Sequence, residues 1–142
     1  MQHAVPVDTP VGILTGRDAI SLDESTLPAA YGDTLTLVGE LNGRCCSRNP
    51  AAPNWRYTIT FTDVHGVRIA AVEFSDHPDH VASFEEVLES DWLADMQRAD
   101  PPENLHGDAA HYRFWTNDDV FEIICAREFA LVLTPLTEPA TM

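Results

Sequence analysis

Alternation of apolar and polar residues runs through much of the chain and predicts a protein built mainly of antiparallel strands. The clearest case is the segment 55–62, where Trp55, Tyr57, Ile59 and Phe61 alternate with arginine and threonine. Successive side chains of a strand point to opposite faces, so this pattern is typical of a strand with one buried face. We expect further strands at residues 11–14, 34–42, 67–74, 111–116, 120–126 and 129–134.

Turn residues between these strands predict two hairpins. The segment 63–66 ends in glycine and predicts a hairpin over residues 55–74, and the Asn-Asp-Asp sequence at 117–119 predicts a second one. Arg127 and Glu128 then interrupt the apolar pattern, which indicates either a bulge in one long strand or a corner to a last strand. If the last strand, 129–134, lies at a sheet edge, it offers a surface for pairing with a second copy as a homodimer.

One helix is predicted, within the segment from Asp76 to Asp108. The tetrapeptide 83–86, Ser-Phe-Glu-Glu, matches a capping box, so we expect the helix to begin at Ser83. Apolar residues follow at spacings of three and four, which gives the helix one apolar stripe. It should end before Asp100-Pro101-Pro102, because proline disfavours helical geometry in the residue before it.

These elements predict a single α+β domain over residues 1–142, mainly antiparallel β with one acidic helical insertion. Six to seven strands joined mostly by hairpins are typical of a sandwich, a rolled sheet or a small barrel. The expected parts are an N-terminal arm with a short strand (1–33), central strands (34–74), an acidic helical segment (76–108), and a C-terminal hairpin and strand (109–134).

The charge of the chain narrows the classes of partner. Its 142 residues contain 23 acidic residues and eight basic ones, all arginine, for a formal net charge of −15. Arginine without lysine is typical of a GC-rich coding sequence, and we expect a bacterial source. Such a surface repels nucleic-acid phosphate and anionic membrane, and it attracts basic protein surfaces. The alternative is that the charge serves solubility alone.

The cysteines and the N-terminal residues favour a cytoplasmic protein. Cys45 and Cys46 are adjacent, and Cys125 lies alone in an apolar run, so the odd total does not resemble a secreted disulfide framework. The first residues lack a basic start and an apolar core, and about eighteen consecutive apolar residues occur nowhere. We therefore expect reduced thiols, no export signal and no membrane span.

The acidic charge is concentrated in the segment 76–108, which holds ten acidic residues and one arginine and so carries −9 of the total −15. We therefore expect a non-enzymatic interaction domain that binds a basic protein surface, comparable in charge to inhibitors or immunity-type neutralisers of toxins. Trp92 would supply an aromatic anchor beside the carboxylates. The expected contact residues are Glu85, Glu86, Glu89, Asp91, Trp92 and Asp95.

The alternative hypothesis is a divalent-metal site, in a binding domain or a metal-dependent hydrolase. Asp76, His77, Asp79 and His80 place four donors in five residues, and in this hypothesis His106 or His111 returns beside them in the fold. Imidazole and carboxylate groups suit zinc and similar metals when three or four donors converge. No other cofactor is indicated, because the chain has neither a P-loop nor a Gly-x-Gly-x-x-Gly sequence.

Nucleophilic catalysis lacks a sequence motif. The chain contains serine, cysteine, histidine and acidic residues, but no Gly-x-Ser-x-Gly elbow. Glu40, Glu73 and Glu122 fall in expected strands, where glutamate usually points to solvent. These observations favour a binding domain over an enzyme.

Overall fold

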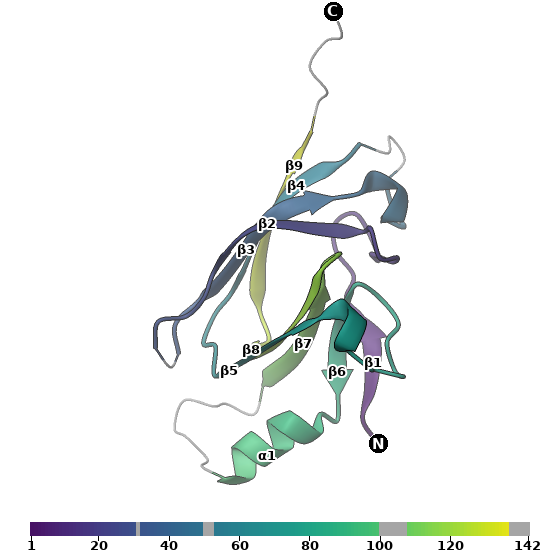
Figure 1. The fold of residues 1–142 in the computed structure, drawn as a ribbon. Coiled ribbons are helices and arrows are strands. Elements are labelled where there is room, and N and C mark those ends of the chain that lie inside the picture. Colours follow the sequence, from purple (N-terminus) through teal and green to yellow (C-terminus); the bar gives the residue numbers. More distant parts are fainter. Residues whose placement is uncertain (31, 50–52, 100–107, 137–142) are drawn as a thin grey trace, which may run out of the picture.

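The computed structural model describes residues 1–30, 32–49, 53–99 and 108–136, and they form two antiparallel sheets and one α-helix (Figure 1). This confirms the predicted α+β class, but the described residues form nine strands where six to seven were expected. The five-stranded sheet contains β1 (His3–Pro6), β6 (Phe84–Leu88), β7 (Ala109–Trp115), β8 (Asp119–Ala126) and β5 (Gly66–Ala71), in that order. The four-stranded sheet contains β2 (Ile20–Thr26), β3 (Leu35–Leu41), β4 (Trp55–Phe61) and β9 (Phe129–Pro135).

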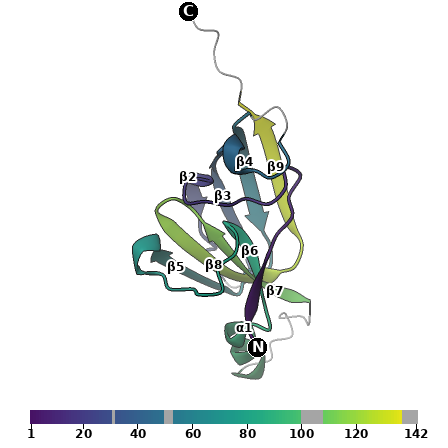
Figure 2. The same cartoon turned by 90° about the vertical axis from the view of Figure 1, so that its right-hand side faces the viewer.

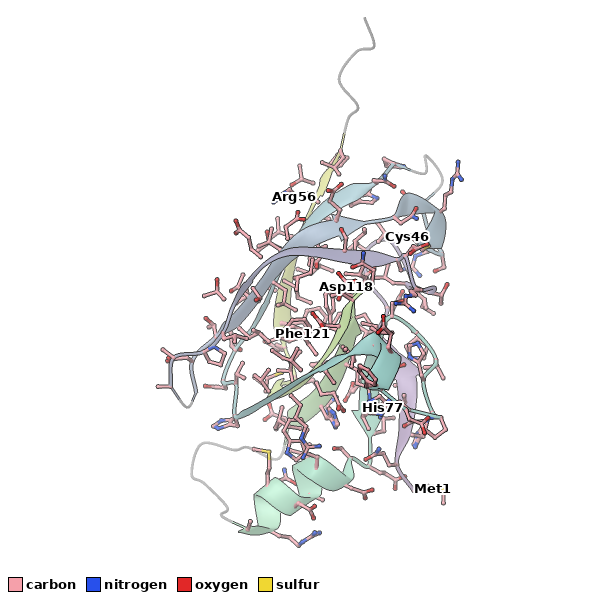
Figure 3. The ribbon with its side chains drawn as sticks, in the orientation of Figure 1. Met1, Cys46, Arg56, His77, Asp118 and Phe121 are labelled. Carbon is pink, nitrogen blue, oxygen red and sulfur yellow. The ribbon has the colours of Figure 1, made fainter. Side chains whose placement is uncertain are left out.

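The hydrophobic core lies between the two sheets, so the arrangement is that of a sandwich. Leu37 and Ile59 of the four-stranded sheet are completely buried, as is Ile123 of the five-stranded sheet. Figure 3 shows Phe121 in the space between the sheets, where it belongs to the same cluster. Alternation in β3, β4, β7 and β8 thus directs one row of each strand into this core.

The C-terminal hairpin is confirmed, and of the two alternatives for Arg127 and Glu128 the structure has the corner, not the bulge. β7 pairs with β8 from Ala109 opposite Ala126 to Trp115 opposite Val120. Arg127 and Glu128 then carry the chain into the other sheet, where β9 pairs with β4. β9 is an outer strand of that sheet. Pairing of this edge with a second copy stays a prediction.

The hairpin predicted over residues 55–74 is wrong. β4 lies between β3 and β9, whereas β5 pairs with β8 in the opposite sheet. The connecting segment therefore passes from one sheet to the other; Thr62 and Asp63 within it are exposed, whereas Val64 and His65 are buried. Asp63 turns the chain with a φ of 47°. The last predicted strand residues, Val72–Phe74, form a short 3-10 helix, η2.

The N-terminal arm differs from its prediction. Residues 11–14 form only isolated bridges, at Gly12 and Leu14, and a φ of 92° at Gly12 is incompatible with a regular strand. β1 and β2 form instead, and both lie at sheet edges. The register of β2 shifts between Leu22 and Glu24, which breaks the alternation that would otherwise have predicted the strand.

The helix expected from Ser83 is also wrong at its start, because residues 84–88 form β6 and the helix α1 spans Asp91–Ala99. The Ser83 hydroxyl donates to the carbonyl of Gly16 and caps no helix. The helix was expected to end before Asp100; α1 is described up to Ala99, and residues 100–102 lie outside the described residues. Figures 1 and 2 show α1 below the five-stranded sheet, away from the four-stranded one. Within the described part of the chain, no helix is long and apolar enough to cross a membrane.

Candidate functional site

A layer of charged and polar side chains covers the face of the five-stranded sheet that points away from the core. Ala110, Tyr112 and Phe114 of β7 belong to the core, so the alternate residues His111 and Arg113 project to the other face. Glu122 lies opposite Arg113 in the β7–β8 register. We call the following set the polar layer: Asp79, Glu85, His111, Arg113 and Glu122.

Arg113 is the centre of the polar layer, with only 1% of its side chain exposed. Its guanidinium donates to Asp79 and Glu85, each at 3.0 Å, and to Glu122 at 3.4 Å. Burial by itself would lower the pKa of Arg113, but the hydrogen bonds to Asp79 and Glu85 raise it above its ordinary value. The arginine therefore stays charged, and its charge is compensated in place.

Glu85 explains why residues 84–88 form a strand. The side chain is completely buried, and Arg113 and the indole of Trp115 both donate to its Oε2, each at 3.0 Å. The amides of Val81 and Ala82 donate to its Oε1 at 2.8 and 3.0 Å. Burial would raise the pKa of Glu85, but these donors together lower it. A helix beginning at Ser83 would remove Glu85 from these partners.

A chain of three hydrogen-bonded side chains adjoins Arg113. Ser90 Oγ lies 2.7 Å from His111 Nδ1, and His111 Nε2 lies 2.9 Å from Glu122 Oε1. Burial would raise the pKa of Glu122, but the hydrogen bond with His111 and the nearby His77 and Arg113 lower it to about 2. Glu122 is therefore a carboxylate at neutral pH. The expectation that it points to solvent is wrong, because only 13% of its side chain is exposed.

The four predicted metal donors do not converge, because their side chains have different surroundings in the structure. His77 approaches Glu122 at 3.6 Å, His80 contacts Glu85 at 3.1 Å, and Asp79 binds Arg113, whereas Asp76 is exposed. Burial and the neighbouring Arg113 lower the pKa of His77. Among the residues that the structure describes, no three His, Cys, Asp or Glu side chains have an arrangement that could hold a metal ion. His106 lies outside those residues.

A pocket of about 350 Å³ opens where the loop 75–83 meets β7. His77 and His80 both line it beside Trp115, and Figure 3 shows His77 on this loop. The imidazole of His80 lies over the indole of Trp115 with ring centres 4.0 Å apart. The histidines thus form one wall of a pocket whose other lining residues include Trp115 and Thr116.

The predicted contact residues divide into buried and exposed groups. Glu85 is buried, and Glu86 forms an ion pair with Arg127, so neither provides a free surface charge. Glu89, Asp91 and Asp95 are exposed at the start of α1 and along it. Trp92 is half-buried, with the Arg68 guanidinium 3.9 Å from its ring centre and His111 at its edge.

Sequence reasoning missed the polar layer. The available signal was the strand register: a hairpin with a two-residue turn at 117–118, one residue shorter than the turn predicted, places Arg113 opposite Glu122. What the pattern does not show is that this face is covered by the loop 75–83 and by α1. Ser90 and Glu85 belong to a segment predicted as one helix, where neither could lie beside β7.

No protein-family model, no curated protein and no solved structure matches the chain.

Proposed function

We propose that this protein is an interaction domain that binds a basic protein surface, as inhibitors or immunity-type neutralisers do. The observation that supports the proposal is that most of the arginine side chains already interact with side chains of the same chain. Six of the eight form ion pairs with acidic side chains of the same chain. A seventh, Arg68, lies over the ring of Trp92. The remaining surface charge is therefore almost entirely negative.

The contact surface in this proposal is narrower than the segment 76–108. We assign it to the exposed carboxylates Glu89, Asp91 and Asp95 near the N-terminal end of α1, with no contribution from Glu85, Glu86 or Trp92. Glu89 and Asp95 already meet cations, but these pairs are more than 60% exposed and therefore contribute little. A partner's arginine or lysine side chains can replace those cations at small cost.

We also propose that the protein has a bacterial source and a cytoplasmic location. Cys45, Cys46 and Cys125 are free thiols in the structure. Free thiols persist in a reducing compartment, and this supports the assignment.

A pair of charge-matched variants tests the proposed surface. The first neutralises α1 by Glu89→Gln, Asp91→Asn and Asp95→Asn, and the control neutralises Asp18, Glu24 and Glu40 around β2 and β3 in the same way. Both variants lose three negative charges, so a partner attracted only by net charge will not distinguish them. We expect the wild type and the control, used as baits at 50 mM salt, to retain a basic protein that the α1 variant loses.

The retained protein is then purified and its affinity for each variant is measured by calorimetry at two salt concentrations. A decrease of about tenfold or more confined to the α1 variant supports the proposal. Equal binding by both variants, or the absence of any basic protein on the wild type at low salt, contradicts it.

A further inference from the structure

Ser90 stands at a sharp turn between a strand and a helix. β6 ends at Leu88, α1 begins at Asp91, and Glu89 between them has a φ of 51°. Positive φ in a residue other than glycine is uncommon and tends to occur at functional sites, where the surroundings impose it. A strand–turn–helix connection is also the setting of the nucleophilic serine in hydrolase elbows, although the glycines of that motif are absent here.

The direction of each hydrogen bond at Ser90 follows from Glu122, the acceptor at the far end of the hydrogen-bonded series Ser90–His111–Glu122. Glu122 is a carboxylate and only accepts, so the proton of His111 is on Nε2. His111 Nδ1 then carries a lone pair and accepts the Ser90 hydroxyl proton at 2.7 Å. The Leu93 amide occupies one lone pair of Ser90 Oγ at 3.1 Å. The second lone pair is left for attack, as in the resting state of a serine–histidine–acid triad.

Ser90 and His111 both line a pocket of about 400 Å³ between α1 and the edge of β6. Val87, Leu88 and Leu93 contribute apolar walls, while Glu89 and the ion pair of Glu86 with Arg127 lie at its border. This volume suits a small ligand, and the border has no excess of positive charge that would attract an anionic one. The pocket therefore fits a small uncharged acyl group.

A backbone donor stands beside the serine. The amide of Asp91, the residue after Ser90, donates to the side-chain oxygen of Gln2 at 2.9 Å. In hydrolase elbows the amide after the nucleophile stabilises the oxyanion of the tetrahedral intermediate. Gln2 shows that this amide accommodates an amide carbonyl oxygen, and a substrate oxygen would have to displace it.

From this geometry we propose that Ser90, His111 and Glu122 form a catalytic triad that hydrolyses small uncharged esters. Ser90 Oγ attacks the ester carbonyl carbon while its proton moves to His111 Nδ1, and the carbon–oxygen bond to the alcohol breaks as His111 returns that proton to the leaving oxygen. Water then attacks the acyl-serine, gives its proton to His111 Nδ1, and releases the carboxylic acid as the proton returns to Ser90. Glu122 holds the imidazole and balances its transient charge.

Covalent labelling tests the nucleophile directly. The wild type is treated with an uncharged alkyl fluorophosphonate, and the adduct is located by mass spectrometry of the intact chain and of its peptides. We expect one adduct, on Ser90, and none on Ser90→Asn, which retains a side chain able to cap α1. Ser83→Ala is the matched control, because Ser83 is equally buried but hydrogen-bonds to Gly16 outside this pocket, and it should label like the wild type.

Hydrolysis of p-nitrophenyl butyrate provides the second readout. Glu122→Gln should lower kcat by about 10²- to 10⁴-fold with KM little changed, since the amide no longer fixes the imidazole tautomer. Gln2→Ala should raise kcat by freeing the Asp91 amide, an effect that a purely structural Ser90–His111 contact does not produce. Circular dichroism establishes that each variant is folded. An unlabelled wild type at saturating probe, or equal labelling of Ser90→Asn, overturns the proposal.

Discussion

Arg113 has an unusual environment for an arginine, because its guanidinium lies completely within the protein and faces three carboxylates. Transfer of such charges from water is costly, and the cost is recovered only while all partners are present. The layer therefore contributes more to the specificity of the fold than to its net stability. It ties the loop 75–83, β6, β7 and β8 together through one side chain.

We expect Arg113→Met to destabilise the protein by about 3–5 kcal/mol, because Glu85 is then left as a buried charge without its cation. The control is Arg56→Met, which removes an ion pair with Asp23 whose side chains are 46% and 45% exposed. That change should cost at most about 1 kcal/mol. Urea unfolding of both variants measures the difference. Similar losses of unfolding free energy in the two variants would show that the buried cluster contributes no more to stability than an exposed ion pair.

Glu122 makes stability depend on pH. Its folded pKa of about 2 lies below the ordinary value of 4.5, so the unfolded chain binds a proton at this site more readily than the folded chain does. The stabilisation, about 3 kcal/mol, is complete above about pH 4.5 and is lost as the pH falls toward 2. We expect unfolding free energies measured by urea from pH 6 to pH 2.5 to fall less steeply for Glu122→Gln than for the wild type. Parallel profiles would contradict the assignment.

At the scale of elements, alternation was a reliable guide for five of the strands with one face in the core. β3, β4, β7, β8 and β9 were all predicted within two residues of their observed bounds. Alternation did not predict which strands pair with each other, because a buried face does not identify the sheet to which a strand belongs. β4 and β5 follow each other in the chain, yet the buried connection through Val64 places them in opposite sheets.

The segment 83–99 shows a second limit. Its apolar residues fit a helical stripe and Ser83 fits a cap, but tertiary contacts decide the outcome: Phe84 packs among core aromatics and Glu85 binds Arg113. The partner that stabilises the strand lies 28 residues away in the chain, so no local pattern reveals it. Separation in sequence also hides the Ser90–His111–Glu122 series, because Ser90 lies 21 residues from His111. From the sequence, therefore, only the part of the polar layer that lies on β7 and β8 was predictable.

Trp92 is one of the side chains that hold helix α1 on the sheet. It lies over Gly66 of β5, where an added Cβ would come within 2.8 Å of the ring, so a larger residue at this position would displace the tryptophan. His111 meets the edge of the same ring. Trp92 thus helps to position both the helix that carries the proposed contact surface and the serine that precedes it, and the two proposed activities share this support.

At the scale of the whole molecule, negative charge exceeds positive charge by far more than the internal ion pairs can compensate. With a net charge of −15, the folded chain places its excess carboxylates closer together than the unfolded chain does. Added salt weakens this repulsion, and it also weakens the exposed ion pairs. The repulsion is the larger effect, because each exposed pair contributes at most about 1 kcal/mol and the buried Arg113 cluster is poorly screened.

We therefore expect sodium chloride to stabilise the protein. Raising the concentration from 0.01 M to 1 M shortens the Debye length from about 30 Å to about 3 Å. The thermal midpoint should rise by about 3–5 °C, which corresponds to about 1 kcal/mol for a chain of this size. The variant lacking the charges of Asp18, Glu24 and Glu40 should begin at a higher midpoint and respond less, since part of its repulsion is already removed. A midpoint that falls with salt would mean that the surface ion pairs outweigh the repulsion.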